Sequence, residues 1–228
     1  MEIIKKYATK RTLGILLILC MLIALLPLLP GQQAHAEIDI TTKITIFNMD
    51  GQPQELNATY PYLKNGERAK SGKLGKDGCT AYFNHKNGYL YLKDFKEQSI
   101  QCLENNQGTL SIRLEGDNTI TNKGTGERYG IANVNGGDIT IVKNSETVTR
   151  PRLTIDVESS DGEATGISGS RAHNRKSDIF IADVELTIDA SYTGNRSITS
   201  YGVITTGIFQ INNNTSFNTK VTVIATEW

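Results

Sequence analysis

Carboxylates that could share a cation occupy equivalent positions in two short segments of the sequence. Asp156 follows Leu153-Thr154-Ile155, and Asp189 follows Leu186-Thr187-Ile188. If the two segments are stacked strands, both carboxylates lie on one face, and oxygen ligands of this kind suit calcium. Asp156 and Asp189 are therefore candidate calcium ligands. The alternative is a solvated acidic ladder that holds no metal.

Aromatic side chains that could stack on sugars concentrate in the N-terminal part of the chain. Tyr89 and Tyr91 alternate with Leu90 and Leu92, and alternate residues of a strand point to opposite faces. If the leucines face the core, the tyrosines form an outward strip that predicts a ligand-binding surface. The alternative is that these aromatic side chains pack the N-terminal cap of the fold.

A short basic segment could contact an anionic glycan. Arg171 and Arg175 lie close together in the sequence, beside His173 and Lys176. We expect this segment to form a loop between two strands, which makes Arg171 and Arg175 candidate ligand-binding residues. An ordinary solvated loop is the alternative.

No catalytic residues are predicted. Beyond residue 36 the histidines are His85 and His173, and neither lies in a metal-binding spacing or beside a nucleophile motif. Paired carboxylates for glycoside cleavage need a defined separation, which a sequence does not contain. A polysaccharide lyase or hydrolase therefore stays open as an alternative to a non-catalytic protein.

Two cysteines, Cys79 and Cys102, follow the N-terminal apolar segment. An exported compartment permits a disulfide between them, and a bridge closing a loop of this length would contribute about 3 kcal/mol. The alternative is two buried thiols that pack as small apolar groups. Both interpretations are structural rather than catalytic.

The elements that must position these residues recur along the chain. Gly130, Gly166 and Gly202 each precede a β-branched residue and are spaced 36 residues apart. Short alternating segments, such as 138–141 and 178–181, recur between them. A fixed period of this length is typical of a solenoid, in which connecting loops vary while strands recur.

Each predicted strand offers too few aliphatic side chains to form a core alone. Stacked coils would bury the aliphatic residues in one continuous column, with Thr140, Thr154 and Thr187 facing outward. The predicted column comprises Ile112, Ile141, Ile155, Ile188 and Val223. We therefore predict an all-β fold, a right-handed parallel β-helix, in preference to a β-sandwich with similar short strands.

The N-terminus predicts export. Four basic residues within 5–11 precede an apolar run, and Ala34-His35-Ala36 supplies small residues at the cleavage positions. An uncleaved membrane anchor is the alternative, because the apolar run is nearly long enough to span a bilayer. Cleavage after Ala36 would give an extracellular protein, either secreted or associated with the cell surface.

The predicted organisation has three parts. A signal peptide covers 1–36, an N-terminal strand pair and cap cover 37–87, and parallel β-helix repeats cover 88–228. The whole chain has 24 basic and 24 acidic residues, and residues 1–36 hold four and one of them, which leaves 20 and 23. This slight excess of negative charge gives no support for nucleic-acid binding.

Several stretches resemble a known group of repeat proteins. Residues 89–95 (YLYLKDF) and 108–121 (GTLSIRLEGDNTIT) resemble a strand and a coil of secreted and cell-surface β-helix proteins of Gram-positive bacteria. Residues 44–52 resemble their N-terminal strand pair. The resemblance implies a pectate-lyase-like, right-handed parallel β-helix of carbohydrate-binding type, placed at the cell surface or in a carbohydrate-rich setting.

These observations predict a secreted, non-catalytic protein that acts at the bacterial surface in glycan binding or adhesion. Its expected partner is a polysaccharide or a host or cell-surface component, and no cofactor is expected apart from the candidate calcium. The alternatives are a lyase-like or hydrolase-like enzyme and a structural envelope protein whose sheet faces self-associate.

Overall fold

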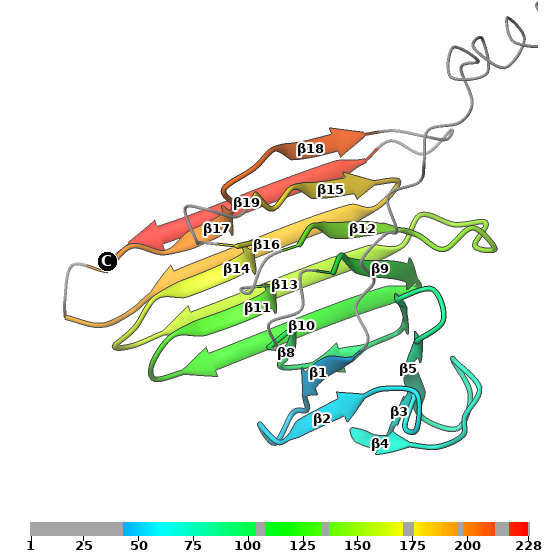
Figure 1. The fold of residues 1–228 in the computed structure, drawn as a ribbon. Coiled ribbons are helices and arrows are strands. Elements are labelled where there is room, and N and C mark those ends of the chain that lie inside the picture. Colours follow the sequence, from blue (N-terminus) through cyan, green and yellow to red (C-terminus); the bar gives the residue numbers. More distant parts are fainter. Residues whose placement is uncertain are drawn as a thin grey trace, which may run out of the picture. The chain divides into compact units, whose positions relative to one another are not determined.

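The short alternating segments form stacked strands in the computed structural model of the chain (Figure 1). The structure describes residues 43–103, 108–133, 137–170, 176–195, 198–212 and 219–227. The predicted signal peptide lies outside these ranges. The described residues are all-β, and none of them belongs to a helix that could cross a membrane.

Three sheets contribute to the fold. The six-stranded sheet contains, in order, β17 (Tyr201–Ile204), β14 (Ala164–Ser168), β11 (Arg128–Ala132), β8 (Ser99–Gln101), β1 (Ile44–Phe47) and β2 (Pro53–Leu56). The five-stranded sheet contains β19 (Lys220–Glu227), β16 (Glu185–Tyr192), β13 (Arg152–Ser159), β10 (Asp117–Gly124) and β7 (Lys96–Glu97). The eight-stranded sheet contains β18 (Phe209–Asn212), β15 (Ile179–Ala182), β12 (Ile139–Lys143), β9 (Leu110–Glu115), β6 (Tyr89–Lys93), β5 (Cys79–Asn84), β3 (Tyr62–Lys64) and β4 (Glu67–Ala69).

Parallel pairing stacks successive turns of the chain. The strand triplets β9–β10–β11, β12–β13–β14 and β15–β16–β17 each place one strand in each sheet, which gives a β-solenoid of about three turns. β13 pairs in parallel with β10 and with β16 along its whole length. The predicted parallel β-helix is therefore confirmed.

Antiparallel strands close the N-terminal end of the stack. β1 pairs antiparallel with β2 and β8, and β5 pairs antiparallel with β3 and β6. Ile44, Ile46, Leu63 and Phe83 from these strands are fully buried. They cover the apolar end of the first turn, which would otherwise face solvent.

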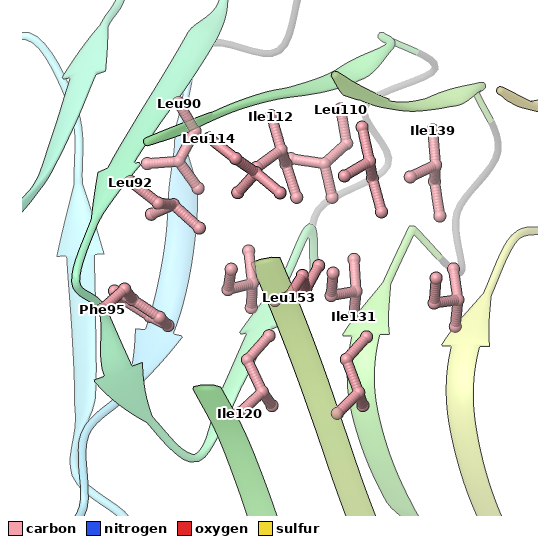
Figure 2. Packing of buried hydrophobic residues seen from close by; sticks show 14 of the residues in the cluster. Leu90, Leu92, Phe95, Leu110, Ile112, Leu114, Ile120, Ile131, Ile139 and Leu153 are labelled. Atoms are coloured by element: carbon pink, nitrogen blue, oxygen red, sulfur yellow. The ribbon is translucent and has the colours of Figure 1, made fainter. Parts of the chain in front are cut away.

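The aliphatic core forms separate columns on facing sheets. Ile112 and Ile141 are register partners in the eight-stranded sheet, whereas Ile155, Ile188 and Val223 are partners in the five-stranded sheet. The prediction of one continuous column is therefore wrong, because equivalent residues stack only within their own sheet. The columns meet in one core, where leucines and isoleucines from different strands fill the interior (Figure 2).

The recurring glycines allow two sheets to approach each other. Gly130, Gly166 and Gly202 lie in β11, β14 and β17 of the six-stranded sheet. A methyl group on Gly166 would overlap the Ile188 Cγ2 atom and lie 2.6 Å from the Gly202 carbonyl oxygen. Glycine at these three positions is thus a packing requirement, set by Ile155, Ile188 and Val223 of the five-stranded sheet.

A buried asparagine turns one corner of the coil. Asn118 is 1% exposed, and its Nδ2 donates to the carbonyl oxygens of Glu115 and Arg152, each at 3.2 Å. Its Oδ1 accepts from the backbone N–H of Phe95 at 3.2 Å. This side chain therefore links three successive turns where the chain passes from one sheet to the next.

Both described cysteines are buried, and no disulfide joins them. Cys79 lies in β5, and Cys102 follows β8. The Cys79 thiol donates to the Ala81 carbonyl oxygen at 3.6 Å, and burial raises the pKa of this thiol. Of the two interpretations that the sequence left open, the structure contains the pair of buried thiols.

Candidate ligand-binding groove

A row of tyrosines crosses the N-terminal strands of the eight-stranded sheet. Tyr82 of β5 is the register partner of Tyr62 in β3 and of Tyr91 in β6. The ring centroids of Tyr62 and Tyr82 are 4.8 Å apart, and those of Tyr82 and Tyr91 are 5.9 Å apart. Leu90 and Leu92 are fully buried, so the tyrosines of β6 point outward, as expected if the leucines face the core.

The rings of this row largely cover one another's faces. Tyr62, Tyr82 and Tyr91 stack at interplanar angles of 23°, and Tyr89 meets Tyr91 edge-on at 6.3 Å. The Arg113 guanidinium lies over the Tyr89 ring, 4.6 Å from its centroid. A ligand would therefore meet ring edges and hydroxyl groups here, rather than the free ring faces that sugar stacking uses.

A groove of about 390 Å³ lies beside these tyrosines. This volume is within the range of roughly 300–1,000 Å³ that is common for small-ligand sites. The strands contribute ring, amide and carboxylate groups to its lining, from Tyr82, Asn84, Tyr91 and Glu115. These groups can donate hydrogen bonds to a hydroxyl-rich ligand and accept them from it.

Two loops complete the lining of the groove. Lys73 and Leu74 come from the segment before β5, and residues 144–146 follow β12. Backbone hydrogen bonds hold both loops, from Lys76 N–H to the Lys73 carbonyl at 2.9 Å and from Asn144 N–H to the Leu114 carbonyl at 2.8 Å. The groove is thus built from segments that are distant in the sequence.

Two ionisable groups at or beside the groove, Lys93 and Tyr82, have raised pKa values. Glu115 accepts a hydrogen bond from the Lys93 ammonium, and this bond raises the pKa of Lys93 above its ordinary value. Burial, together with Tyr62 and Tyr91, raises the pKa of Tyr82. Lys93 therefore stays cationic at neutral pH, and the Tyr82 phenol stays neutral and able to donate a hydrogen bond.

The two candidate calcium ligands lie side by side on another sheet. Asp156 of β13 and Asp189 of β16 are register partners, and adjacent strands are separated by about 4.8 Å. The Lys123 Nζ atom lies 2.8 Å from an Asp156 carboxylate oxygen and 3.6 Å from a Glu158 oxygen. The stacking expected from the sequence is present, but one of the two carboxylates is already paired with a lysine.

Calcium at this position lacks geometric support. Calcium takes about 6–8 oxygen ligands, and within the described ranges no three His, Cys, Asp or Glu side chains gather as metal ligands. The hydrogen bond with Asp156 also raises the pKa of Lys123. A lyase base must accept a proton, so this lysine is unsuited to that role.

The other candidate ligand-binding residues from the sequence are the two arginines and the tyrosines of β6. Arg171 and Arg175 lie outside the described residues. Of the two predicted tyrosines of β6, Tyr91 lines the groove and Tyr89 does not, whereas Asn84, Asn144 and Glu146 line it and were not predicted. No sequence pattern relates the loop after β12 to the strands at the N-terminal end, because the two meet only through the stacking of turns.

No protein-family model, curated protein or solved structure matches this chain. The solenoid and the groove therefore have to be interpreted from their own geometry.

Proposed function

We propose that this chain is a secreted, non-catalytic β-helix protein that binds a polysaccharide at the bacterial surface through the groove beside Tyr82 and Tyr91. The observation that supports this most strongly is the composition of the lining. Tyrosine hydroxyls, two asparagine amides and two carboxylates surround one open groove, and such groups match the alternating donors and acceptors of a sugar chain.

The sequence supports the setting of this function. The basic and apolar N-terminal segment favours export, and the resemblance of residues 89–121 to Gram-positive, pectate-lyase-like β-helix proteins favours a carbohydrate-rich environment. The same resemblance favours a right-handed coil. A host or cell-surface glycan would offer the same chemistry as a bacterial polysaccharide.

The protonation states favour binding without cleavage. Lys93 and Lys123 each donate to a carboxylate that raises their pKa, so neither lysine is a ready proton acceptor at neutral pH. Glu115, which lines the groove, is engaged by Lys93. We therefore propose that the carboxylates of the groove accept hydrogen bonds from sugar hydroxyls.

Binding to a panel of plant, host and bacterial wall polysaccharides, with product release monitored, tests this function. We expect binding without product. Replacing Tyr91 by Ala, Asn84 by Ala, or Glu146 by Gln should each weaken binding about tenfold, because each removes a hydrogen bond or ring contact worth about 1–1.5 kcal/mol.

Tyr60→Ala is the matched control. The Tyr60 ring lies against Arg68 and Lys70, 4.7 Å and 5.5 Å from its centroid, and is not part of the groove lining. Its removal should leave affinity unchanged. Release of product would instead assign the chain to the lyase or hydrolase class, and equal loss of binding in Tyr60→Ala and Tyr91→Ala would refute the groove as the site.

A further inference from the structure

A recess outside the groove lies at the corner where β10 passes into β11. Its volume is about 380 Å³, and it is lined by ring, amide and guanidinium groups that include Phe47, Gln98, Gln101, Asn122, Arg128 and Tyr129. These residues come from β1, β8, β10, β11 and the segments that join them. None of them lines the groove described above.

The recess arises because β7 and β8, which precede the first turn, are shorter than β10 and β11 of that turn. β10 has eight residues, but β7 pairs only with Thr119 and Ile120. Likewise, Ile131 and Ala132 at the end of β11 are its only residues that pair with β8. The corner from Thr121 to Gly130 therefore extends beyond β7 and β8, and this difference in length leaves the space open.

Two of the residues that line this recess, Asn122 and Arg128, each carry a buried polar atom that lacks a hydrogen-bond partner in the described part of the chain. Asn122 is 5% exposed, and its Nδ2 donates to the Tyr129 carbonyl oxygen at 2.8 Å. The Asn122 Oδ1 and the Arg128 Nε are both buried without a partner among the described residues. An unsatisfied buried group costs about 1–3 kcal/mol, so a ligand that pairs with both atoms would recover that free energy.

The chemistry of the two atoms selects the ligand. Asn122 Oδ1 can only accept a hydrogen bond and Arg128 Nε can only donate one, whereas a hydroxyl group does both at once. A carboxylate or phosphate could pair with Arg128 but could not donate to Asn122. Glu127, whose carboxylate accepts from the Tyr129 hydroxyl at 2.7 Å, also lines the recess and disfavours an anion.

We propose that this recess is a second binding site for one neutral sugar unit, whose hydroxyl groups pair with Asn122 Oδ1 and Arg128 Nε as these two side chains turn toward the ligand. The Phe47 and Tyr129 rings supply apolar surface for the carbon skeleton of the sugar. This site shares its ligand class with the proposed groove but rests on different residues, so either site can fail without the other.

Titration followed by nuclear magnetic resonance tests the recess directly. The ¹⁵N-labelled protein is titrated with the methyl glycosides of glucose, galactose and N-acetylglucosamine, and with glucuronate as the anionic comparison. We expect a neutral glycoside to shift the Arg128 Nε–H and Asn122 Nδ2–H resonances in a saturable way. Glucuronate should bind more weakly than that glycoside.

Variants separate this site from the groove. Arg128→Lys keeps the positive charge but removes the Nε–H donor, so affinity at the recess should fall about tenfold. Tyr91→Ala should leave the recess shifts unchanged. The proposal is overturned if no neutral glycoside shifts the two side-chain resonances of the unsubstituted protein, if glucuronate binds more tightly, or if Arg128→Lys binds as well as the original.

Discussion

Glu97 is a carboxyl group that the fold holds in an unfavourable environment. Glu97 is 6% exposed, and one of its carboxylate oxygens accepts a hydrogen bond from the Met49 N–H at 2.9 Å. Burial raises the pKa of Glu97 to about 7, and the nearby Asp50 adds to the increase. In the unfolded chain the group ionises near its ordinary value of 4.5. Between these values the folded state holds a proton that the unfolded state has released.

The stability of the protein should therefore fall as the pH rises from about 4.5 through 7. The protonated Glu97 side chain contributes its full share to the free energy of unfolding below pH 4.5, the pKa in the unfolded chain. Above about pH 7, the pKa in the folded protein, at most about 3 kcal/mol of this contribution is lost. Glu97→Gln keeps an oxygen acceptor for Met49 and should raise stability at pH 8 while changing it little at pH 4.5. Urea unfolding at both pH values measures this. An equal effect of the substitution at the two pH values would contradict the assignment.

Single residues were predictable from the sequence only where a strand fixed their direction. Alternation in residues 89–93 was enough to place Leu90 and Leu92 inside and the tyrosines outside. It could not show that Tyr62, Tyr82 and Tyr91 cover one another's faces, because that depends on pairing between β3, β5 and β6. The pairing of Asp156 with Lys123 was hidden for the same reason, since it forms between two turns of the coil.

The glycine ladder of β11, β14 and β17 explains why the most visible repeat of the sequence lies in the six-stranded sheet. Each glycine faces an aliphatic side chain of the five-stranded sheet, as Gly130 faces Ile155 and Gly166 faces Ile188. The strands of the eight-stranded sheet are spaced less regularly. Its strands start at Leu110, Ile139 and Ile179, so the loops before them vary in length.

Gly166→Ala should destabilise the protein by about 3 kcal/mol. The added methyl group would overlap Ile188 Cγ2 and approach the Gly202 carbonyl oxygen, and overpacking of a core typically costs about 1–3 kcal/mol. Thr154→Ala, at an exposed position of β13, serves as the control and should have little effect. Thermal or urea unfolding gives both values. A loss below about 0.5 kcal/mol for Gly166→Ala would show that the sheets can separate without cost.

The repeat therefore predicted the architecture but not the arrangement of its core. Recurring short strands were sufficient for a parallel β-helix, because each strand needs a stacked neighbour to bury its aliphatic face. The repeat alone does not predict which strand belongs to which sheet. Ile112 and Ile155 were consequently assigned to one column, although they lie in different sheets.

Packing is uneven along the stack of turns. Ile179, Ile181 and Ile188 are fully buried, whereas their register partners Phe209, Ile211 and Val223 are 38%, 45% and 43% exposed. In a solenoid each turn is stabilised by its neighbours, and local opening follows local packing. The last strands, β18 and β19, should therefore open more readily than the earlier turns, which have a neighbour on both sides.

Amide hydrogen exchange measures this difference with matched reporters. The N–H of Ile139 donates to the Asp178 carbonyl and that of Ile179 to the Ile208 carbonyl, both at 2.8 Å. We expect the Ile179 amide to exchange at least about tenfold faster, which corresponds to about 1.4 kcal/mol less protection. Equal protection of the two amides would mean that the solenoid opens as one cooperative unit.

The proposed glycan groove depends on the whole molecule, because the cap, the first turns and the loop after β12 all contribute to it. A crystal structure of the protein with the tightest-binding oligosaccharide from the polysaccharide panel is the most direct test. We predict sugar density between Tyr82, Tyr91 and residues 144–146, with its hydroxyl groups bonded to Asn84 or Glu115. An oligosaccharide bound elsewhere, with the groove unoccupied, would contradict the assignment of the groove as the main binding site.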